Sequence, residues 1–310
     1  MSSSLRLVAA LTSSLLSFAP AAAGATTATP PEKVPGQPYF GTERYVEYVA
    51  GDLPIVLTSP HGGRLKPDSL PNRTNGVTEM DANTQELARA VADEFFARTG
   101  HRVHLVASHL HRSKLDPNRE IKEAAQGHPA AERIWAEYHA AIRGALDAAS
   151  ARHGFAFLVD LHGHSHPVAR LELGYALGAK QLAVSDAAFD AAGLVAVSTL
   201  SDLHARLGGR ASTLVRGPHS LGALFAQRGL RAVPSPSEPE PGAGPFFDGG
   251  YTVRRHAGGD TPKVDGLQIE CHRTGVRDTA ENRAKFARIA AEVLSQFVEE
   301  HYPFKFPAKK

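Results

Sequence analysis

The feature that most limits the possible fold is an apolar run that ends in a cluster of histidines. Residues 155–159 read FAFLV, and DLHGHSH follows directly at residues 160–166. A short apolar run between a glycine and polar residues is typical of a strand buried on both faces of an α/β sheet, so the polar residues should lie at the sheet edge. Neutral imidazole is the commonest metal ligand in proteins. We therefore expect a metal site there, with a solvated histidine-rich loop as the alternative.

Two other apolar runs end in a similar way. Residues 53–58 (LPIVLT) run into SPHGG, which places His61 just past a strand end, and residues 101–107 lead into a loop that contains Arg112 and Arg119. The proline before His61 and the glycines after it suit a ligand on a tight loop, although a turn histidine without a function has the same surroundings. The planar fork of arginine suits a carboxylate substrate, and the alternative for this pair is two surface salt bridges.

Carboxylates follow the same pattern. Asp81 precedes a segment of helical spacing that starts near Thr84, so it is either a helix cap or a site residue, and Glu79 is either a solvated loop residue or a second candidate. Residues 265–273 read DGLQIECHR and predict a strand on which Glu270 shares a face with Gln268.

The order of elements predicts the fold class. Residues 129–152 carry an amphipathic stripe and form a long helix between the second and third strands, which favours an α/β fold with a mostly parallel mixed sheet flanked by helices. The other expected elements are a strand at 171–177, short helices at 202–207 and 220–228, a long loop or lid at 234–250, and a terminal helix at 279–301. Tyr251 follows the lid, and we expect it to reach the pocket.

The chain begins with the charged, apolar and small-residue order of a secretory signal peptide. Arg6 precedes a mostly apolar segment at residues 7–18, and AAAGA follows at residues 21–25. The apolar segment is shorter than the roughly 20 residues that span a bilayer, so cleavage is favoured over anchoring. We expect residues 1–25 to be a signal peptide, 26–40 a flexible linker and 41–310 a single catalytic α/β domain, exported to the periplasm or the extracellular space.

Composition excludes several partners and sites. The 34 basic and 32 acidic residues leave a formal net charge of +2, which is too small to indicate nucleic acid or an anionic membrane as a partner. Cys271 is the only cysteine, so there is no intramolecular disulfide and zinc would have to be held by histidine and carboxylate.

Five motifs, taken together and in order, resemble the N-formylglutamate amidohydrolase family. They are SPHGG at residues 59–63, Asp81 followed by Thr84 and Glu86-Leu87, DPNR at 116–119, DLHGH at 160–164, and Ile269-Glu270. The resemblance covers most of the chain after the predicted leader. It implies a zinc carboxypeptidase-like (phosphorylase/hydrolase-like) fold, similar to succinylglutamate desuccinylases, with one catalytic zinc and amide hydrolysis on substrates that carry a carboxylate.

The same resemblance implies a metal site. His61 and His162 are the expected zinc ligands, and Asp81 is expected to complete the set, with Glu79 as the second choice. The carboxypeptidase motif has a glutamate three residues after its first histidine, and this chain has Arg64 there, so the carboxylate must come from farther along the chain.

The resemblance also implies catalytic roles. Glu270 is expected to be the general base for a metal-activated water, and Arg119 to bind or polarise the substrate. Further substrate contacts are expected from Arg112, Asn118 and Tyr251, and Asp160 or His164 is expected to orient a metal ligand.

Three other functions stay open. A secreted zinc carboxypeptidase or a cell-wall peptide amidase would fit export, whereas a serine hydrolase is disfavoured because no G-x-S-x-G follows a strand. A secreted metal-binding or ligand-binding protein without turnover is the non-enzyme alternative. Glu270 argues against it, because binding zinc alone would not require a free carboxylate there.

Overall fold

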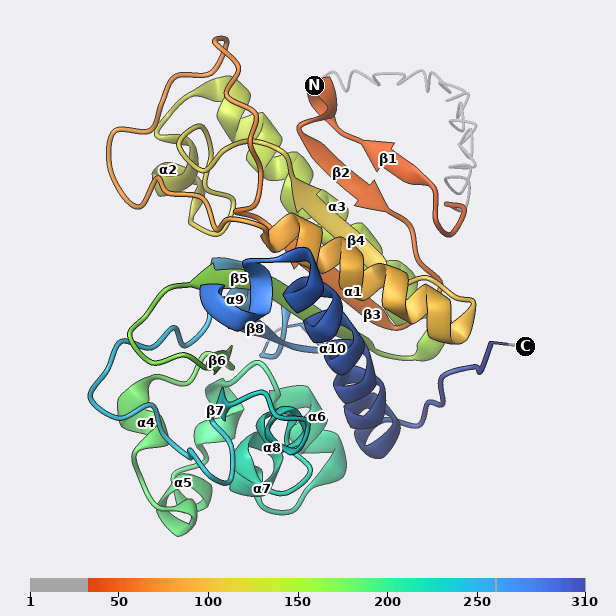
Figure 1. Cartoon of the computed structure of the whole chain (residues 1–310), viewed down its shortest axis with the longest axis vertical. Helices are drawn as coiled ribbons and strands as arrows, with labels where there is room; N and C mark the ends of the chain where they lie inside the picture. Colours follow the sequence, from red (N-terminus) through yellow and green to blue (C-terminus); the bar gives the residue numbers. More distant parts are fainter. Residues whose placement is uncertain (1–32, 260, 310) are drawn as a thin grey trace, which may run out of the picture. The chain divides into compact units, whose positions relative to one another are not determined.

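An eight-stranded mixed sheet organises the part of the chain that the computed structural model describes, residues 33–259 and 261–309 (Figure 1). The predicted signal peptide and residues 26–32 of the predicted linker lie outside the described residues. The strands are β1 (Pro38–Phe40), β2 (Val46–Val49), β3 (Ile55–Ser59), β4 (His104–Ser108), β5 (Ala156–His164), β6 (Leu171–Gly174), β7 (Ala232–Val233) and β8 (Val264–His272). Their order across the sheet is β1-β2-β4-β3-β5-β8-β6-β7.

The four central strands are parallel to one another. β3 pairs in parallel with β4 and with β5, and β5 pairs in parallel with β8. Because the carboxyl ends of parallel strands meet at one edge of a sheet, the residues that follow these strands are brought together there. The outer pairs β1-β2, β2-β4 and β6-β8 are antiparallel, which makes the sheet mixed, as expected.

The helices complete the α/β architecture. They are α1 (Thr84–Thr99), α2 (Ile121–Ala125), α3 (Pro129–His153), α4 (Ala179–Leu182), α5 (Asp186–Ala191), α6 (Ser201–Leu207), α7 (Ala211–Arg216), α8 (Leu221–Gln227), α9 (Tyr251–His256) and α10 (Ala280–His301). Shorter helical turns are η1 (Thr42–Arg44), η2 (Leu194–Val197) and η3 (Arg273–Arg277).

Apolar side chains cover both faces of the central strands. Leu57 and Phe157 pack with residues of α1 and α10, which lie side by side in Figure 1, on one face. Val56 and Leu158 pack with residues of α3 on the other face. A central strand buried on both sides needs an uninterrupted apolar run, which is why the runs at 53–58 and 155–159 predicted these strands correctly.

The amino-terminal edge of the sheet differs from the expectation. The last residues of the predicted linker form β1, which pairs antiparallel with β2 and places Tyr39 opposite Tyr48. The two rings pack in a tilted arrangement at a centroid distance of 6.2 Å, and aromatic cross-strand pairs stabilise short edge strands. Of the described helices, none is long and apolar enough to cross a membrane.

Candidate functional site

A cavity of about 290 Å³ lies at the carboxyl edge of the central strands. Its lining includes every residue expected in the site except Tyr251, namely His61, Asp81, Arg112, Asn118, Arg119, His162 and Glu270. These residues come from segments up to 209 positions apart in the sequence (from 61 to 270), and the parallel register of the sheet brings them together.

The two histidines lie on either side of a switch in chain direction. The chain leaves β3 through α1 to reach β4 on one side, and then passes through α3 to reach β5 on the other side of β3. Crevices at such switch points are the usual ligand sites of open α/β sheets. His61 lies two residues past the end of β3, and His162 lies on β5 directly opposite Glu270 of β8.

His61, Asp81 and His162 form a buried group with the composition of a metal site. Their ligand atoms lie within 4.8 Å of one another. Asp81 Oδ2 is 3.3 Å from Nδ1 of His61 and 3.2 Å from Nδ1 of His162. Ligands held about 2.0–2.1 Å from a tetrahedral zinc lie about 3.3 Å apart, so the donor set and its spacing fit a zinc-like ion.

Both imidazoles are anchored through their other ring nitrogen. Nε2 of His61 lies 2.7 Å from Oδ1 of Asp116, and Nε2 of His162 lies 2.8 Å from Oδ2 of Asp160. An Nε2–H that donates to a carboxylate leaves the Nδ1 lone pair for a metal, and this contact also fixes the ring orientation. Asp160 is itself held by the Thr58 hydroxyl, which donates to Oδ1 at 2.5 Å.

The electrostatics of the group link metal binding to proton release. Burial acts to raise the pKa of Asp81, but the charges and hydrogen bonds of His61 and His162 hold that pKa well below its usual range. Burial acts to lower the pKa of His162, but Asp160 and Asp81 raise it well above its usual value. A metal that binds His162 competes with the proton that this raised pKa favours, so metal affinity should rise with pH.

Glu270 has the surroundings of a general base. Its side chain is buried, its Oε1 accepts a hydrogen bond from Gln268 Nε2 at 3.0 Å, and its Oε2 has no partner among the described residues. Burial raises the pKa of Glu270 to about 8, against the opposing charge of His162 and with further increases from Asp81 and Glu172. A buried carboxylate oxygen without a partner is costly, and such groups are found where a ligand or reaction uses them.

The two arginines of the cavity differ in how firmly neighbouring residues hold their guanidinium groups. The Arg112 guanidinium is buried, its Nε donates to Asp116 Oδ2 at 2.8 Å and its Nη1 lies 3.6 Å from Asp81 Oδ1. Arg119 has a side chain that is 34% exposed, and its Nε bonds at 3.1 Å to Glu123, which is more exposed still. Since a surface pair of this kind is weak, Arg119 can turn to a substrate, whereas Arg112 is committed to the carboxylates around it.

Asn118 links the cavity to the chain that follows the predicted lid. Its Oδ1 accepts a hydrogen bond from Thr252 N at 2.7 Å, and the added side chain of any residue other than glycine at position 250 would overlap the Asn118 amide. Asn118 is therefore occupied in holding this turn beside the cavity.

Two of the sequence expectations are decided by the course of the loops. The Tyr251 ring does not line the cavity, because it packs against Trp135 and His139 on the far side of the turn. Glu79 is exposed, whereas Asp81 faces the histidines. Asp81 also does not cap α1 with its side chain, since the N-cap residue of that helix is Asn83.

A second group of possible ligands, His164, His166 and Glu172, is satisfied internally. His164 Nε2–H donates to Arg170 O at 2.9 Å, and its Nδ1 accepts from His166 N at 3.1 Å. Glu172 accepts from His166 Nδ1 at 3.0 Å and from Phe247 N at 2.9 Å. A metal would have to break these bonds, so the group serves to hold the predicted lid against β6.

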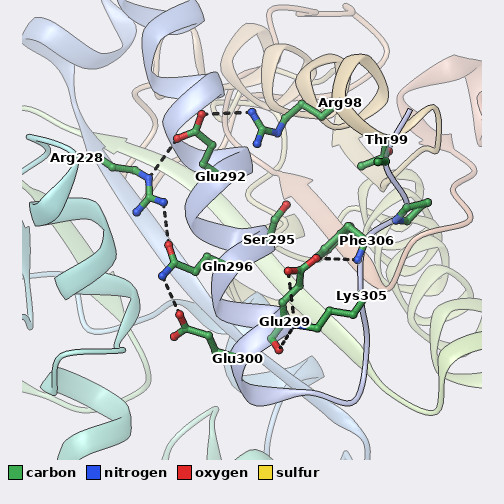
Figure 2. Close-up of a pocket in the computed structure, with 12 residues that line it drawn as sticks. Arg98, Thr99, Arg228, Glu292, Ser295, Gln296, Glu299, Glu300, Lys305 and Phe306 are labelled. Atoms are coloured by element: carbon green, nitrogen blue, oxygen red, sulfur yellow. Dashed lines mark hydrogen bonds and ion pairs between the residues drawn. The ribbon is translucent and has the colours of Figure 1, made fainter. Parts of the chain in front are cut away.

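A larger cavity of about 590 Å³ lies beside the C-terminal half of α10. The charged side chains that line it are paired with other side chains. Figure 2 shows Arg98 and Arg228 directed at Glu292, with distances of 3.3 and 3.2 Å. Arg228 also donates to Gln296, which in turn donates to Glu300. The smaller cavity at the sheet edge is therefore the better candidate for chemistry.

Several residues of the site were missed in the sequence. Asp116 contacts His61, although only Asp160 and His164 were expected to orient a ligand. Phe246 and Phe247 line the cavity from the predicted lid. The signal for Asp116 was its position in a loop that follows a parallel strand, since such loops meet at the same edge of the sheet.

Comparisons with known proteins support the family and the fold. A family model described as N-formylglutamate amidohydrolase matches residues 123–276. No curated protein matches the sequence. The solved structure of an N-formylglutamate amidohydrolase from Ralstonia eutropha JMP134 is similar, with a TM-score of 0.52 and 17% identity over 83% of this chain and 97% of that chain. A gene product of Agrobacterium tumefaciens gives a TM-score of 0.51 and 14% identity over 83% of this chain and 94% of that one. At these identities the two structures confirm the α/β fold and no more.

Proposed function

We propose that this chain cleaves the amide bond of an N-acyl amino acid or a related substrate that carries a carboxylate. The chain belongs to the N-formylglutamate amidohydrolase family and is a hydrolase of that type. The observation that carries the proposal is the buried group of His61, Asp81 and His162 beside Glu270, which has a carboxylate oxygen without a partner. A site of this composition is suited to metal-assisted hydrolysis.

The metal of the proposed reaction is zinc, held by Nδ1 of His61, Nδ1 of His162 and a carboxylate oxygen of Asp81. When bound, zinc supplies a Lewis acid that lowers the pKa of a coordinated water and polarises a carbonyl. Asp116 and Asp160 keep the two imidazoles oriented by accepting from Nε2, which directs both Nδ1 atoms at the metal position.

Glu270 moves the proton. Its Oε2 takes the proton from the attacking water and returns it to the leaving nitrogen, while the hydrogen bond from Gln268 fixes Oε1. The low polarity that raises the pKa of Glu270 makes it an effective base at neutral pH, because a base works best when its pKa lies near the working pH.

Arg119 supplies the contact to the substrate carboxylate. It lines the cavity, its Nη1 donates to Asn118 O at 2.8 Å, and its one ion-pair partner among the described residues is the exposed Glu123, so turning to a substrate costs it little. Arginine keeps its charge at every working pH and offers a planar fork to a carboxylate. Arg119→Lys should lower kcat/KM by about 10-fold, since a hydrogen bond to a charged group contributes about 1.5–3 kcal/mol. Unchanged kinetics would make Arg119 a surface residue.

We also propose that the protein is exported. The support is the order of a charged residue, the apolar segment at 7–18 and small residues at 21–25. Fractionation of the producing cells tests this, and a full-length cytoplasmic protein would contradict it.

The metal site is tested by elemental analysis of the purified protein. We expect about one zinc per chain in the wild type, and a loss of most of it in both His61→Ala and His162→Ala. Full retention in both variants would refute the site. A hydrolysis screen over N-acyl amino acids and short peptides then decides between an amidohydrolase, a peptidase and a binding protein, which would bind such ligands and release no product.

A further inference from the structure

Arg277 is a buried arginine just outside the cavity whose guanidinium serves only the main chain. It is the last residue of η3, directly after β8, and is 4% exposed. Its three nitrogens donate to carbonyls on three separate segments: Nη1 to Ala82 O, Nη2 to His164 O at 3.1 Å, and Nε to Cys271 O at 3.1 Å. Within the described ranges, no carboxylate forms an ion pair with it.

Each of these carbonyls lies next to a residue of the proposed site. Ala82 directly follows Asp81, Cys271 directly follows Glu270, and His164 lies two residues after His162. One guanidinium therefore joins the loop that carries Asp81 to the two strands that carry His162 and Glu270. The main chain of Arg277 adds a fourth link, because its carbonyl accepts from Asn83 Nδ2 at 2.9 Å.

The loop with Asp81 needs such a link more than the other segments do. His162 and Glu270 lie on neighbouring strands of the sheet, where the register fixes their positions. Asp81 lies on the loop before α1, and its other main-chain ties are to His61 O and to the first residue of α1. Arg277 is thus the side chain that ties this loop to β5 and β8.

The sequence leaves room for this contact at Gly163. A Cβ atom at that position would overlap Arg277 Nε and lie 2.5 Å from Cζ, so only glycine lets the guanidinium approach β5. The Gly163 N–H also donates to Asp81 Oδ2 at 3.2 Å. The guanidinium, Gly163 and the Asp81 carboxylate are therefore packed as one unit.

We propose that Arg277 is a positioning residue of the metal centre, which holds the Asp81 carboxylate at the distance from His61 and His162 that a zinc ion requires. The inference rests on the proposed metal site. A buried guanidinium that serves only carbonyls gives up its hydration without a charged partner, and this cost is explained if it fixes a ligand. Substitution of a residue that orients a metal ligand typically lowers metal affinity by about 10- to 100-fold.

The test compares Arg277→Ala and Arg277→Lys with Arg273→Ala in the full chain. Arg273 is the matched control, since it belongs to the same turn but is exposed. Zinc affinity is measured by competition with a chelator, the absorption spectrum of the Co²⁺-loaded protein reports the ligand geometry, and thermal unfolding of the metal-free protein reports stability.

We expect Arg277→Ala to lose about 10- to 100-fold in zinc affinity and to change the Co²⁺ spectrum. Arg277→Lys should show a smaller loss, because an ammonium group can reach some of the three carbonyls but not all. Arg273→Ala should match the wild type.

The outcomes separate this inference from the proposed function. Unchanged zinc affinity and an unchanged Co²⁺ spectrum in Arg277→Ala overturn the role of Arg277 and leave the metal site standing. A wild type that binds no zinc overturns both. If Arg277→Ala does not fold, Arg277→Lys decides: a loss of affinity supports the inference, and wild-type affinity refutes it.

Discussion

Replacing Glu270 by Gln separates its role as a base from any role in holding metal. The substitution keeps the shape of the side chain and its contact with Gln268, but removes the proton acceptor at Oε2. General acid–base catalysis contributes about 10²- to 10⁴-fold, which corresponds to about 3–5 kcal/mol of barrier. We expect a loss of that size in kcat, a small change in KM, and full retention of zinc.

The structure also predicts how stability changes in the metal-free protein. The pKa of Glu270 is raised from 4.5 to about 8 by burial, so the folded state holds a proton that the unfolded state releases. Wild-type stability should therefore fall as pH rises from about 4.5 to about 8. At about 1.4 kcal/mol per pKa unit, this change sets an upper bound of about 5 kcal/mol on the loss.

Glu270→Gln should remove much of this pH dependence. We expect the free energy of unfolding of the variant to exceed that of the wild type by about 2 kcal/mol at pH 8, with no increase at pH 4.5. The gain stays below the upper bound because the new amide N–H₂ also needs a hydrogen-bond partner. The assays are steady-state kinetics and zinc content with metal present, and thermal unfolding after chelation. Loss of zinc in the variant would make Glu270 a ligand, and wild-type kcat would refute its role as the base.

Two further predictions concern the carboxylate that binds the metal and the carboxylate of Glu47 on β2. Asp81→Ala should weaken zinc binding by more than about 100-fold, because about 100-fold is the upper limit for residues that only orient a ligand. Glu79→Ala should leave zinc binding unchanged. Competition with a chelator measures both affinities, and the reverse order would make Glu79 the ligand. Burial acts to raise the pKa of Glu47, but hydrogen bonds from His109 and Arg89 lower it to about 2. Glu47 should therefore contribute stability above pH 4.5 that is lost as pH falls towards 2. Because Arg89 is partly exposed, we expect Glu47→Gln to lower the free energy of unfolding at pH 7 by only about 1–2 kcal/mol. Chemical unfolding measures this loss, and an equal loss at pH 2 would contradict the prediction.

Local sequence was enough for the framework of the site. The runs before His61 and His162 are apolar without interruption because central strands are buried on both faces, and alternation along the last strand placed Glu270. Since parallel strands end at a common edge, these three residues could be predicted to meet. The sheet edge formed by β1 was not predicted, because three residues at the end of a linker have no periodicity that distinguishes them.

Loop residues could not be placed in the same way. Whether Asp81 or Glu79 faces the histidines depends on the path of one loop, and the Asn83 N-cap with its left-handed backbone is part of that path. Tyr251 packs on Trp135 and His139 because α9 begins at that residue and turns it away from the cavity.

The sequence by itself determined which strands end in imidazole and carboxylate, because burial on two faces leaves a clear local pattern. Only the tertiary structure decided that Asp116 supports His61, that Arg112 is already committed to carboxylates, and that Arg277 joins three segments of the site. The contact of Asp116 with His61 spans 55 positions and that of Arg277 with Ala82 spans 195, and both depend on loop paths and strand register that no local pattern of residues specifies.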